Sequence, residues 1–291
     1  MVSKVCITFA VQQVRMMKRI KLILIAVFAC FQLSAQTYDE LITRAMNAVE
    51  SDSLYQAETW FKKALQLEPA NMRNALLFSN LGTIQRRMGK NQEALESYSL
   101  ALNLTPYSIT MLLNRASLYL DMDYLDKAYV DYCNVIDLDA KNQEALGFRA
   151  YIYMRRRQYQ DARNDYQKLL EVVPGDKTAR IGMAMVNQKL QRYRESLEEF
   201  NRLIVDYPKD VSLLKARAEL EVEMNTLELA LLDLESAVKM APNDAEIYVM
   251  CGDIYLAQGR NREAYVAYEK AVELGVPRPE VQDRLKASKK K

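Results

Sequence analysis

A 34-residue repeat constrains this chain more than any other feature of its sequence. One small residue recurs at steps of 37 and then 34 residues, at Ala57, Ala94, Ala128, Ala162, Ser196, Ala230 and Ala264. A second set lies 12 residues earlier in each repeat, at Ala45, Gly82, Ala116, Ala150, Ala184, Ala218 and Gly252. An aromatic residue or Leu follows the first set by 4 residues, at Phe61, Tyr98, Tyr132, Tyr166, Phe200, Leu234 and Tyr268. Seven copies in phase predict a stack of equivalent units.

Each unit is expected to contain two short amphipathic helices. In residues 75–106, apolar and small residues recur at helical spacing on both sides of Gly89. Proline ends the second helix because it has no amide hydrogen and clashes with the preceding turn, and it stands at Pro69, Pro106, Pro174, Pro208 and Pro242. Ala140 replaces it once, and Pro277 falls one residue late. With only 8 Gly and 7 Pro and no alternating strand patterns, the chain is predicted to be all-α.

A 34-residue period with these marks resembles the tetratricopeptide repeat (TPR) family from Tyr38 to about Arg278. The resemblance implies an all-α, right-handed superhelical solenoid of seven TPR helix pairs plus a C-terminal capping helix. The repeats are placed at residues 38–71, 75–108, 109–142, 143–176, 177–210, 211–244 and 245–278. Residues 279–291 supply the capping helix and a basic tail, and Val281 and Leu285 are expected to cover the last pair.

Two departures from the family pattern are local. The tryptophan common at the fourth position is absent, and Arg180 at that position makes the fifth repeat the least regular. An insert near Met72–Asn74 lengthens the first junction by either one helical turn or a loop.

Residues 1–35 are interpreted as an N-terminal extension and a signal peptide. Lys18, Arg19 and Lys21 precede an apolar stretch, and Leu33-Ser34-Ala35 ends on a small residue suited to cleavage. Export across the inner membrane is predicted, to a bacterial periplasm, with outer-membrane association as a further possibility; an uncleaved membrane anchor is the alternative. Cys30 follows Val27-Phe28-Ala29, which resembles a lipobox with a bulky Phe28, so lipidation is kept as a second alternative. Translation is expected to start at Met16 or Met17.

An arginine and an aspartate recur together, 16 residues apart. Arg115, Arg149 and Arg217 stand at the seventh position of their repeats, and those repeats carry Asp131, Asp165 and Asp233. Repeats two, five and seven lack both residues. We therefore predict structural Arg–Asp bridges between the two helices of a repeat, and a cation–π contact between Arg44 and Trp60 in repeat one.

No constellation for catalysis or for a cofactor is present. The chain has no histidine, the commonest general base and metal ligand, and no Gly-rich phosphate loop. Beyond residue 35 the chain holds 35 basic and 38 acidic residues, without the basic stripe that nucleic acid requires. Cys133 and Cys251 lie in distant repeats and are expected to be buried free thiols. The sequence thus predicts a non-enzyme without cofactors, and Arg155-Arg156-Arg157 is interpreted first as a favourable helix C-terminus and second as a contact for an anionic partner.

The family resemblance implies that positions 2, 5, 9, 12 and 13 of the first helices line a concave groove. The candidate partner-binding residues are Ser79, Thr83, Arg86, Arg87, Leu113, Ser117, Leu120, Tyr151, Met154, Arg155, Ile181, Met185 and Lys189. The Lys and Asn set with which some family members grip a C-terminal carboxylate is absent. The expected function is a non-catalytic scaffold or adaptor that binds a protein or peptide outside the cytoplasm; a lipid-anchored or membrane-associated assembly factor of an envelope complex is the alternative.

Overall fold

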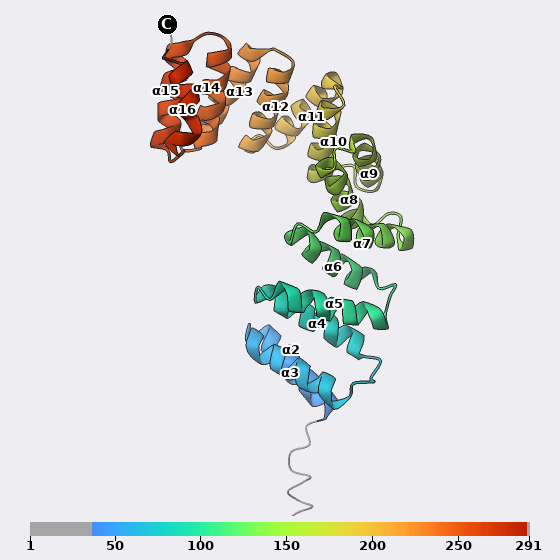
Figure 1. Cartoon of the computed structure of the whole chain (residues 1–291). Helices are drawn as coiled ribbons and strands as arrows, with labels where there is room; N and C mark the ends of the chain where they lie inside the picture. Colours follow the sequence, from blue (N-terminus) through green and yellow to red (C-terminus); the bar gives the residue numbers. More distant parts are fainter. Residues whose placement is uncertain (1–36, 290–291) are drawn as a thin grey trace, which may run out of the picture. The chain divides into compact units, whose positions relative to one another are not determined.

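The computed structural model describes residues 37–289, and every regular element in this part of the chain is an α-helix (Figure 1). The elements are α2 (Tyr38–Glu50), α3 (Leu54–Leu67), α4 (Asn74–Arg87), α5 (Asn91–Leu104), α6 (Ile109–Asp121), α7 (Leu125–Leu138), α8 (Gln143–Arg155), α9 (Tyr159–Val172), α10 (Lys177–Lys189), α11 (Tyr193–Asp206), α12 (Val211–Glu223), α13 (Leu227–Met240), α14 (Ala245–Ala257), α15 (Asn261–Glu273) and α16 (Arg278–Ala287). They fall into two compact units that meet in sequence between Leu118 and Tyr119. The predicted signal peptide, Cys30 and the start site lie outside the described residues.

A left-handed turn joins the two helices of every repeat. Its central residue has positive φ and recurs with the sequence period, at Asp52, Gly89, Asp123, Arg157, Gln191, Asn225 and Gly259. In each turn the central N–H donates to the carbonyl three residues back, and the next N–H donates to the carbonyl five residues back. This Schellman arrangement satisfies two carbonyls that the helix end would leave unpaired. The backbone therefore follows the 34-residue period that the side chains predict.

The other helix ends are also set by local chemistry. Asn142, Asp176, Asp210 and Asp244 each accept a backbone N–H of the following first helix, at 2.7 to 3.1 Å, and so cap it. The second helices α3, α5, α9, α11 and α13 each end two residues before a proline. Helix α7 ends at the same place before Ala140, so packing of the repeat also stops this helix where proline is missing.

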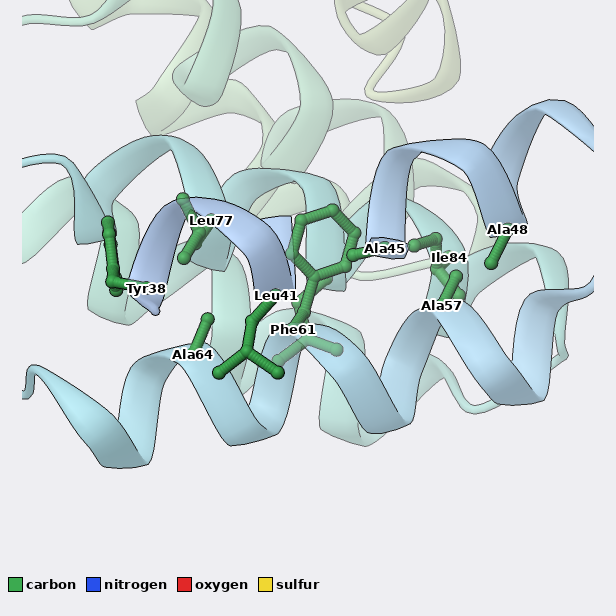
Figure 2. Packing of buried hydrophobic residues seen from close by; sticks show 10 residues of the cluster. Tyr38, Leu41, Ala45, Ala48, Ala57, Phe61, Ala64, Leu77 and Ile84 are labelled. Atoms are coloured by element: carbon green, nitrogen blue, oxygen red, sulfur yellow. The ribbon is translucent and has the colours of Figure 1, made fainter. Parts of the chain in front are cut away.

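The core consists of the three sets of residues that the period identified. The two small-residue sets are buried throughout, and the aromatic set is at most 6% exposed. Figure 2 shows this arrangement in the first unit, where the ring of Phe61 from α3 lies against α2 near Leu41 and Ala45. Small residues allow the helices to approach, and the large ring then fills the space beside them. Ser196 keeps this close packing because its hydroxyl donates to the carbonyl of Ala184 at 2.8 Å.

Three local expectations are now decided. The insert near Met72–Asn74 is a loop, because α3 keeps the 14-residue length of the other second helices and α4 begins only at Asn74. Val281 and Leu285 of α16 are buried against Ala264 and Tyr268 and cover the last repeat, as predicted. Both cysteines are free thiols, but only Cys251 is buried. The expectation for Cys133 was wrong because its position faces the boundary between repeats, where an arginine reaches it.

Candidate functional site

The first-helix face, defined as positions 2, 5, 9, 12 and 13 of the first helices, carries all the candidate partner-binding residues. In the first unit Arg86 Nη2 donates to Ser117 Oγ at 3.0 Å and so links α4 to α6. Arg87 pairs with Asp52 in the turn of the preceding repeat at 2.6 Å. Thr83 is exposed and Leu113 is partly exposed. Ser79 is buried, because its short side chain does not reach beyond the packed helices, so it is not open surface.

In the second unit the same face is richer in exposed apolar groups. Tyr151 and Met185 are each 42% exposed, whereas Leu120, Met154 and Ile181 are partly exposed. Arg155 donates to the Tyr151 hydroxyl at 2.8 Å and pairs with Asp123 at 3.3 Å. Lys189 pairs with Glu223 of the next repeat at 3.1 Å. The cations of this face are therefore held in place by neighbouring repeats while they stay accessible to solvent.

An acidic cavity of about 390 Å³ continues the first-helix face over repeats six and seven. Its floor is apolar, and its acidic residues are Glu219, Glu223 and Asp253. Burial, reinforced by the carboxylate of Glu246, raises the pKa of Glu219 above its ordinary value. Asp253 accepts from the hydroxyl of Tyr268 at 2.8 Å and pairs with Arg284 of α16 at 3.0 Å.

The sequence reasoning missed this cavity because it stopped at repeat five. The signal was present, since Glu219, Glu223 and Asp253 stand at positions 9, 13 and 9 of their repeats, which are positions of the first-helix face. Extending the same positions by two more repeats would have found them.

The Arg–Asp bridges lie away from the first-helix face and join the two helices of one repeat. Arg149 binds Asp165 through two hydrogen bonds of 2.7 and 2.9 Å, and Arg217 binds Asp233 through two of 2.7 and 2.6 Å. These two of the three predicted bridges are confirmed, as is the contact of Arg44 with Trp60, at 5.3 Å from the ring centroid. Arg115 and Asp131 fall in different units, so the third bridge stays a prediction.

Repeat five has a substitute that the sequence reasoning missed. Arg180 stands one helical turn before the usual arginine position, and its Nε donates to Glu199 at 2.6 Å, where other repeats have the aspartate. The longer glutamate compensates for the shift of the arginine. The irregular residue of this repeat therefore completes the same interhelical bridge.

No group of His, Cys, Asp and Glu in residues 37–289 could hold a metal ion. In the same part of the chain, no helix has the length and apolar character needed to cross a bilayer. Arg156, in the basic run that ends α8, pairs with Asp126 and lies 4.4 Å from the ring centroid of Tyr129. These two contacts of Arg156 are internal to the chain.

Comparisons with known proteins agree with this architecture. Family models described as tetratricopeptide repeat match residues 77–106, 109–142, 153–220 and 245–274. The crystal structure of a tetratricopeptide repeat protein from Parabacteroides merdae ATCC 43184 is 38% identical, with a TM-score of 0.70, and the match covers 88% of this chain and all of that chain. The chain belongs to the tetratricopeptide repeat family. The predicted all-α repeat fold is thereby confirmed, and its repeats indicate a protein–protein interaction scaffold.

Other relatives of this TPR protein are more distant. The crystal structure of YrrB, described as a TPR protein with an unusual peptide-binding site, is 18% identical with a TM-score of 0.52, and the match covers 67% of this chain and 100% of that one. A UDP-N-acetylglucosamine–peptide N-acetylglucosaminyltransferase from Giardia intestinalis is 37% identical over 79 residues. This segment is 27% of the present chain, which spans only 5% of the length of that enzyme.

Proposed function

We propose that this TPR protein is a non-catalytic scaffold that binds a peptide or protein on its first-helix face outside the cytoplasm. The observation that carries the proposal is the second unit's face, where exposed Tyr151 and Met185 stand beside ordered cations and the acidic cavity follows. Aromatic, Met and Arg side chains are enriched where proteins bind one another. A groove of this composition suits an extended or helical peptide.

The charges of this face favour a partner with an uneven charge pattern. Arg155 and Lys189 lie on repeats four and five, whereas Glu219 and Asp253 lie on repeats six and seven. A peptide that places acidic groups over α8 and α10 and basic groups over α12 and α14 would complement both. Its apolar side chains would contact Met250 and Ile254 in the cavity.

Site-specific photocrosslinking in the native cell tests the binding face. A photoreactive residue at position 185 is expected to give one dominant adduct with a partner. The matched control places it at position 205, because Val205 is 78% exposed but belongs to a second helix. Equal adducts from both positions, or none from position 185, would contradict binding on the first-helix face.

The location outside the cytoplasm rests on the sequence of residues 17–36 and is tested separately. Mass spectrometry of the protein from the periplasmic fraction is expected to find a mature N-terminus that begins just after Ala35. A cytoplasmic protein that retains Lys18 and Arg19 would contradict export.

A second candidate is a lipid-anchored assembly factor of an envelope complex, favoured only by Cys30 after Val27-Phe28-Ala29. Growth with labelled palmitate distinguishes it from the first. Label that is lost in Cys30→Ala would establish the anchor, and a mature chain that begins beyond Cys30 would exclude it.

A further inference from the structure

Two cavities lie at equivalent places on the side of the repeats where the Arg–Asp bridges stand elsewhere. The larger, which we name the outer pocket, has a volume of about 640 Å³ and lies between α13, α14 and α15. The smaller has about 450 Å³ and lies between α3, α4 and α5. They occur in repeats seven and two, which lack both the arginine and the aspartate. In repeat seven Cys251 and Ala267 take those two places and line the pocket.

Repeat four shows what normally fills this space. Besides its two bonds to Asp165, Arg149 directs Nη1 at the sulfur of Cys133 in the preceding repeat, at 3.5 Å, and lies 5.8 Å from the ring centroid of Tyr153. Arg217 likewise donates to Asn201 of its preceding repeat at 2.7 Å. The guanidinium thus has three surroundings: an aspartate, a residue of the preceding repeat and, in repeat four, an aromatic ring.

Repeat seven retains two of these three surroundings and lacks the arginine at position 7, while the guanidinium of Arg260 lies 4.3 Å from the ring centroid of Tyr255. Glu235 stands where repeat four has Cys133, and Tyr255 stands where it has Tyr153. A carboxylate is a stronger acceptor for a guanidinium than a thiol or an amide. Among residues 37–289, the exposed Glu235 has no hydrogen bond or ion pair, so its carboxylate is open to a partner.

The negative charge of Glu235 also acts on the residues at the floor of the pocket. Burial and then the carboxylate of Glu235 raise the pKa of Cys251 to about 11. Burial and then Cys251 raise the pKa of Tyr255; Arg260 opposes this rise, and Glu235 and Glu263 add to it. Two carboxylates and three cations line the pocket: Glu235, Glu263, Lys239, Arg262 and Lys270. Glu263 pairs with Arg260 at 3.1 Å, so Glu235 is the carboxylate of the lining that has no hydrogen bond or ion pair within residues 37–289. The pocket therefore presents an apolar, aromatic floor beside one carboxylate, Glu235, that is not paired within the described residues.

We propose that the outer pocket of repeat seven binds an arginine side chain of a protein partner, which takes the place of the arginine that this repeat lacks. The guanidinium binds Glu235, and the aliphatic stem lies on Val238 and Val266. The volume lies within the roughly 300–1,000 Å³ of small-ligand sites, so it admits an apolar neighbour of the arginine as well. This surface is separate from the first-helix face.

The cavity of repeat two offers a natural contrast. Lys62 stands there at the place of Glu235 and donates to Glu58 at 2.7 Å, and Glu58 also accepts from Lys90 at 2.7 Å and from Gln85 at 3.3 Å. Ser97, which stands where the aspartate would be, donates to Gln85 Oε1 at 2.7 Å. These side chains bond one another, so we expect no arginine site there.

Titration of the ¹⁵N-labelled full mature chain with the blocked tetrapeptide acetyl-Leu-Arg-Leu-Val-amide tests the proposal. Saturable NMR shifts are expected in α13–α15, with a dissociation constant on the order of 0.1–1 mM. The same peptide with citrulline, which is neutral and of nearly the same shape, is expected to bind at least about tenfold more weakly. Glu235→Gln should weaken the arginine peptide by a similar factor. Glu228→Gln, an exposed change outside the pocket on the same helix, should not.

Three results would overturn the proposal. They are equal binding of the citrulline peptide, unchanged binding to Glu235→Gln, and shifts confined to the first-helix face. Cys251→Arg with Ala267→Asp fills the pocket from within and should abolish the α13–α15 shifts, and its melting curve shows whether it is folded. Photocrosslinking from position 185 is expected to be unchanged in all of these variants, so failure of the pocket and failure of the first-helix face are distinguishable.

Discussion

The core tyrosine of the second helix points in one direction in repeats two and seven and in another direction in repeats three and four. In repeats two and seven the small residue of the first helix is glycine, and the ring packs directly over it, so that a Cβ on Gly252 would lie 2.5 Å from Tyr268. The hydroxyls of Tyr98 and Tyr268 then reach Thr83 and Asp253 on the first-helix face, at 3.0 and 2.8 Å. In repeats three and four an alanine occupies the glycine position.

With alanine there, the ring turns toward the following repeat instead. Tyr132 stacks on Phe148 with centroids 5.5 Å apart, and the ring of Tyr166 lies against Gly182. Repeats three and four also have the arginine and the aspartate, whereas repeats two and seven have neither and leave a cavity. Repeats three and four thus differ from repeats two and seven by the methyl group of the alanine and by the arginine and aspartate, and repeats two and seven have a cavity at this place.

The largest expected effect comes from breaking a bridge. Arg217→Ala leaves Asp233 buried without its cation and close to the buried carboxylate of Glu221. Removing one partner of a buried pair typically costs 3–5 kcal/mol, so we expect the free energy of unfolding to fall by about 4 kcal/mol. Urea unfolding followed by circular dichroism measures it.

The control for this variant removes both charges. Arg217→Met with Asp233→Ala leaves no uncompensated ion, and it should recover most of the loss. If the double variant is as unstable as Arg217→Ala, side-chain packing rather than the unpaired aspartate explains the effect. Arg262→Ala, at an exposed arginine on α15, should change stability by less than about 0.5 kcal/mol.

Adding one methyl group to repeat seven should be nearly as costly. In Gly252→Ala the new Cβ overlaps the ring of Tyr268, which must leave its contact with Asp253. Overpacking of this kind costs about 1–3 kcal/mol, and we expect roughly 2–3. The pair Gly252→Ala with Tyr268→Leu reproduces the alanine and leucine of repeat six and should regain part of the loss. No loss in Gly252→Ala would show that the ring is free to turn.

A pH-dependent effect separates repeat six from the others. Glu221 is 6% exposed, its Oε2 has no hydrogen-bond partner among residues 37–289, and burial followed by the charge of Asp233 raises its pKa to about 7. The folded chain then binds a proton that the unfolded chain has lost, so stability falls as pH rises from about 4.5 to 7 and is level above. Glu221→Gln should therefore stabilise the protein by about 2 kcal/mol at pH 8 and by almost nothing at pH 4. Equal gains at both pH values would contradict the raised pKa.

Grafting the bridge into repeat seven sharpens the comparison further. Cys251→Arg with Ala267→Asp reproduces the pair of repeat six, and Glu235 offers the new arginine a second acceptor. We expect a gain of about 1 kcal/mol, because new ion-pair hydrogen bonds are offset by the desolvation of two charges. Thermal melting measures it, and either single substitution is expected to destabilise instead.

The sequence allowed the repeat, the core and the bridges within a repeat to be predicted, because each depends on residues that share one 34-residue frame. Arg149 with Asp165 is such a case. The sequence did not allow the contact of Arg149 with Cys133 to be predicted, because that contact depends on how two repeats stack. The bridge of Arg180 with Glu199 was missed because Arg180 stands one helical turn before the usual arginine position, from which it still reaches the second helix.

The sequence predicted which positions form the candidate binding face, but it predicted less well which side chains at these positions are exposed. Thr83 and Met185 are exposed as expected, whereas Ser79 is buried, and the pattern alone does not distinguish these outcomes. The outer pocket was not predictable, because a cavity is defined by the absence of side chains from three helices at once. Its only sign in the sequence was the joint loss of arginine and aspartate.

The smallest expected effect concerns the turn between the helices, where repeats two and seven again differ from repeat four. Their central residues are Gly89 and Gly259, whereas repeat four has Arg157 at a φ of 58°. The left-handed region costs a residue with a Cβ roughly 1–2 kcal/mol, and glycine avoids this cost but loses more backbone entropy on folding. Arg157→Gly should therefore raise the free energy of unfolding by about 0.5–1 kcal/mol, and Arg157→Asn by less, since asparagine tolerates this region. Gly89→Ala should lower the free energy of unfolding by about 1 kcal/mol, although no atom lies within 4 Å of its new methyl group. If Arg157→Gly is instead destabilising, the positive charge of the arginine at the end of α8 stabilises the fold by more than the backbone strain at this residue costs.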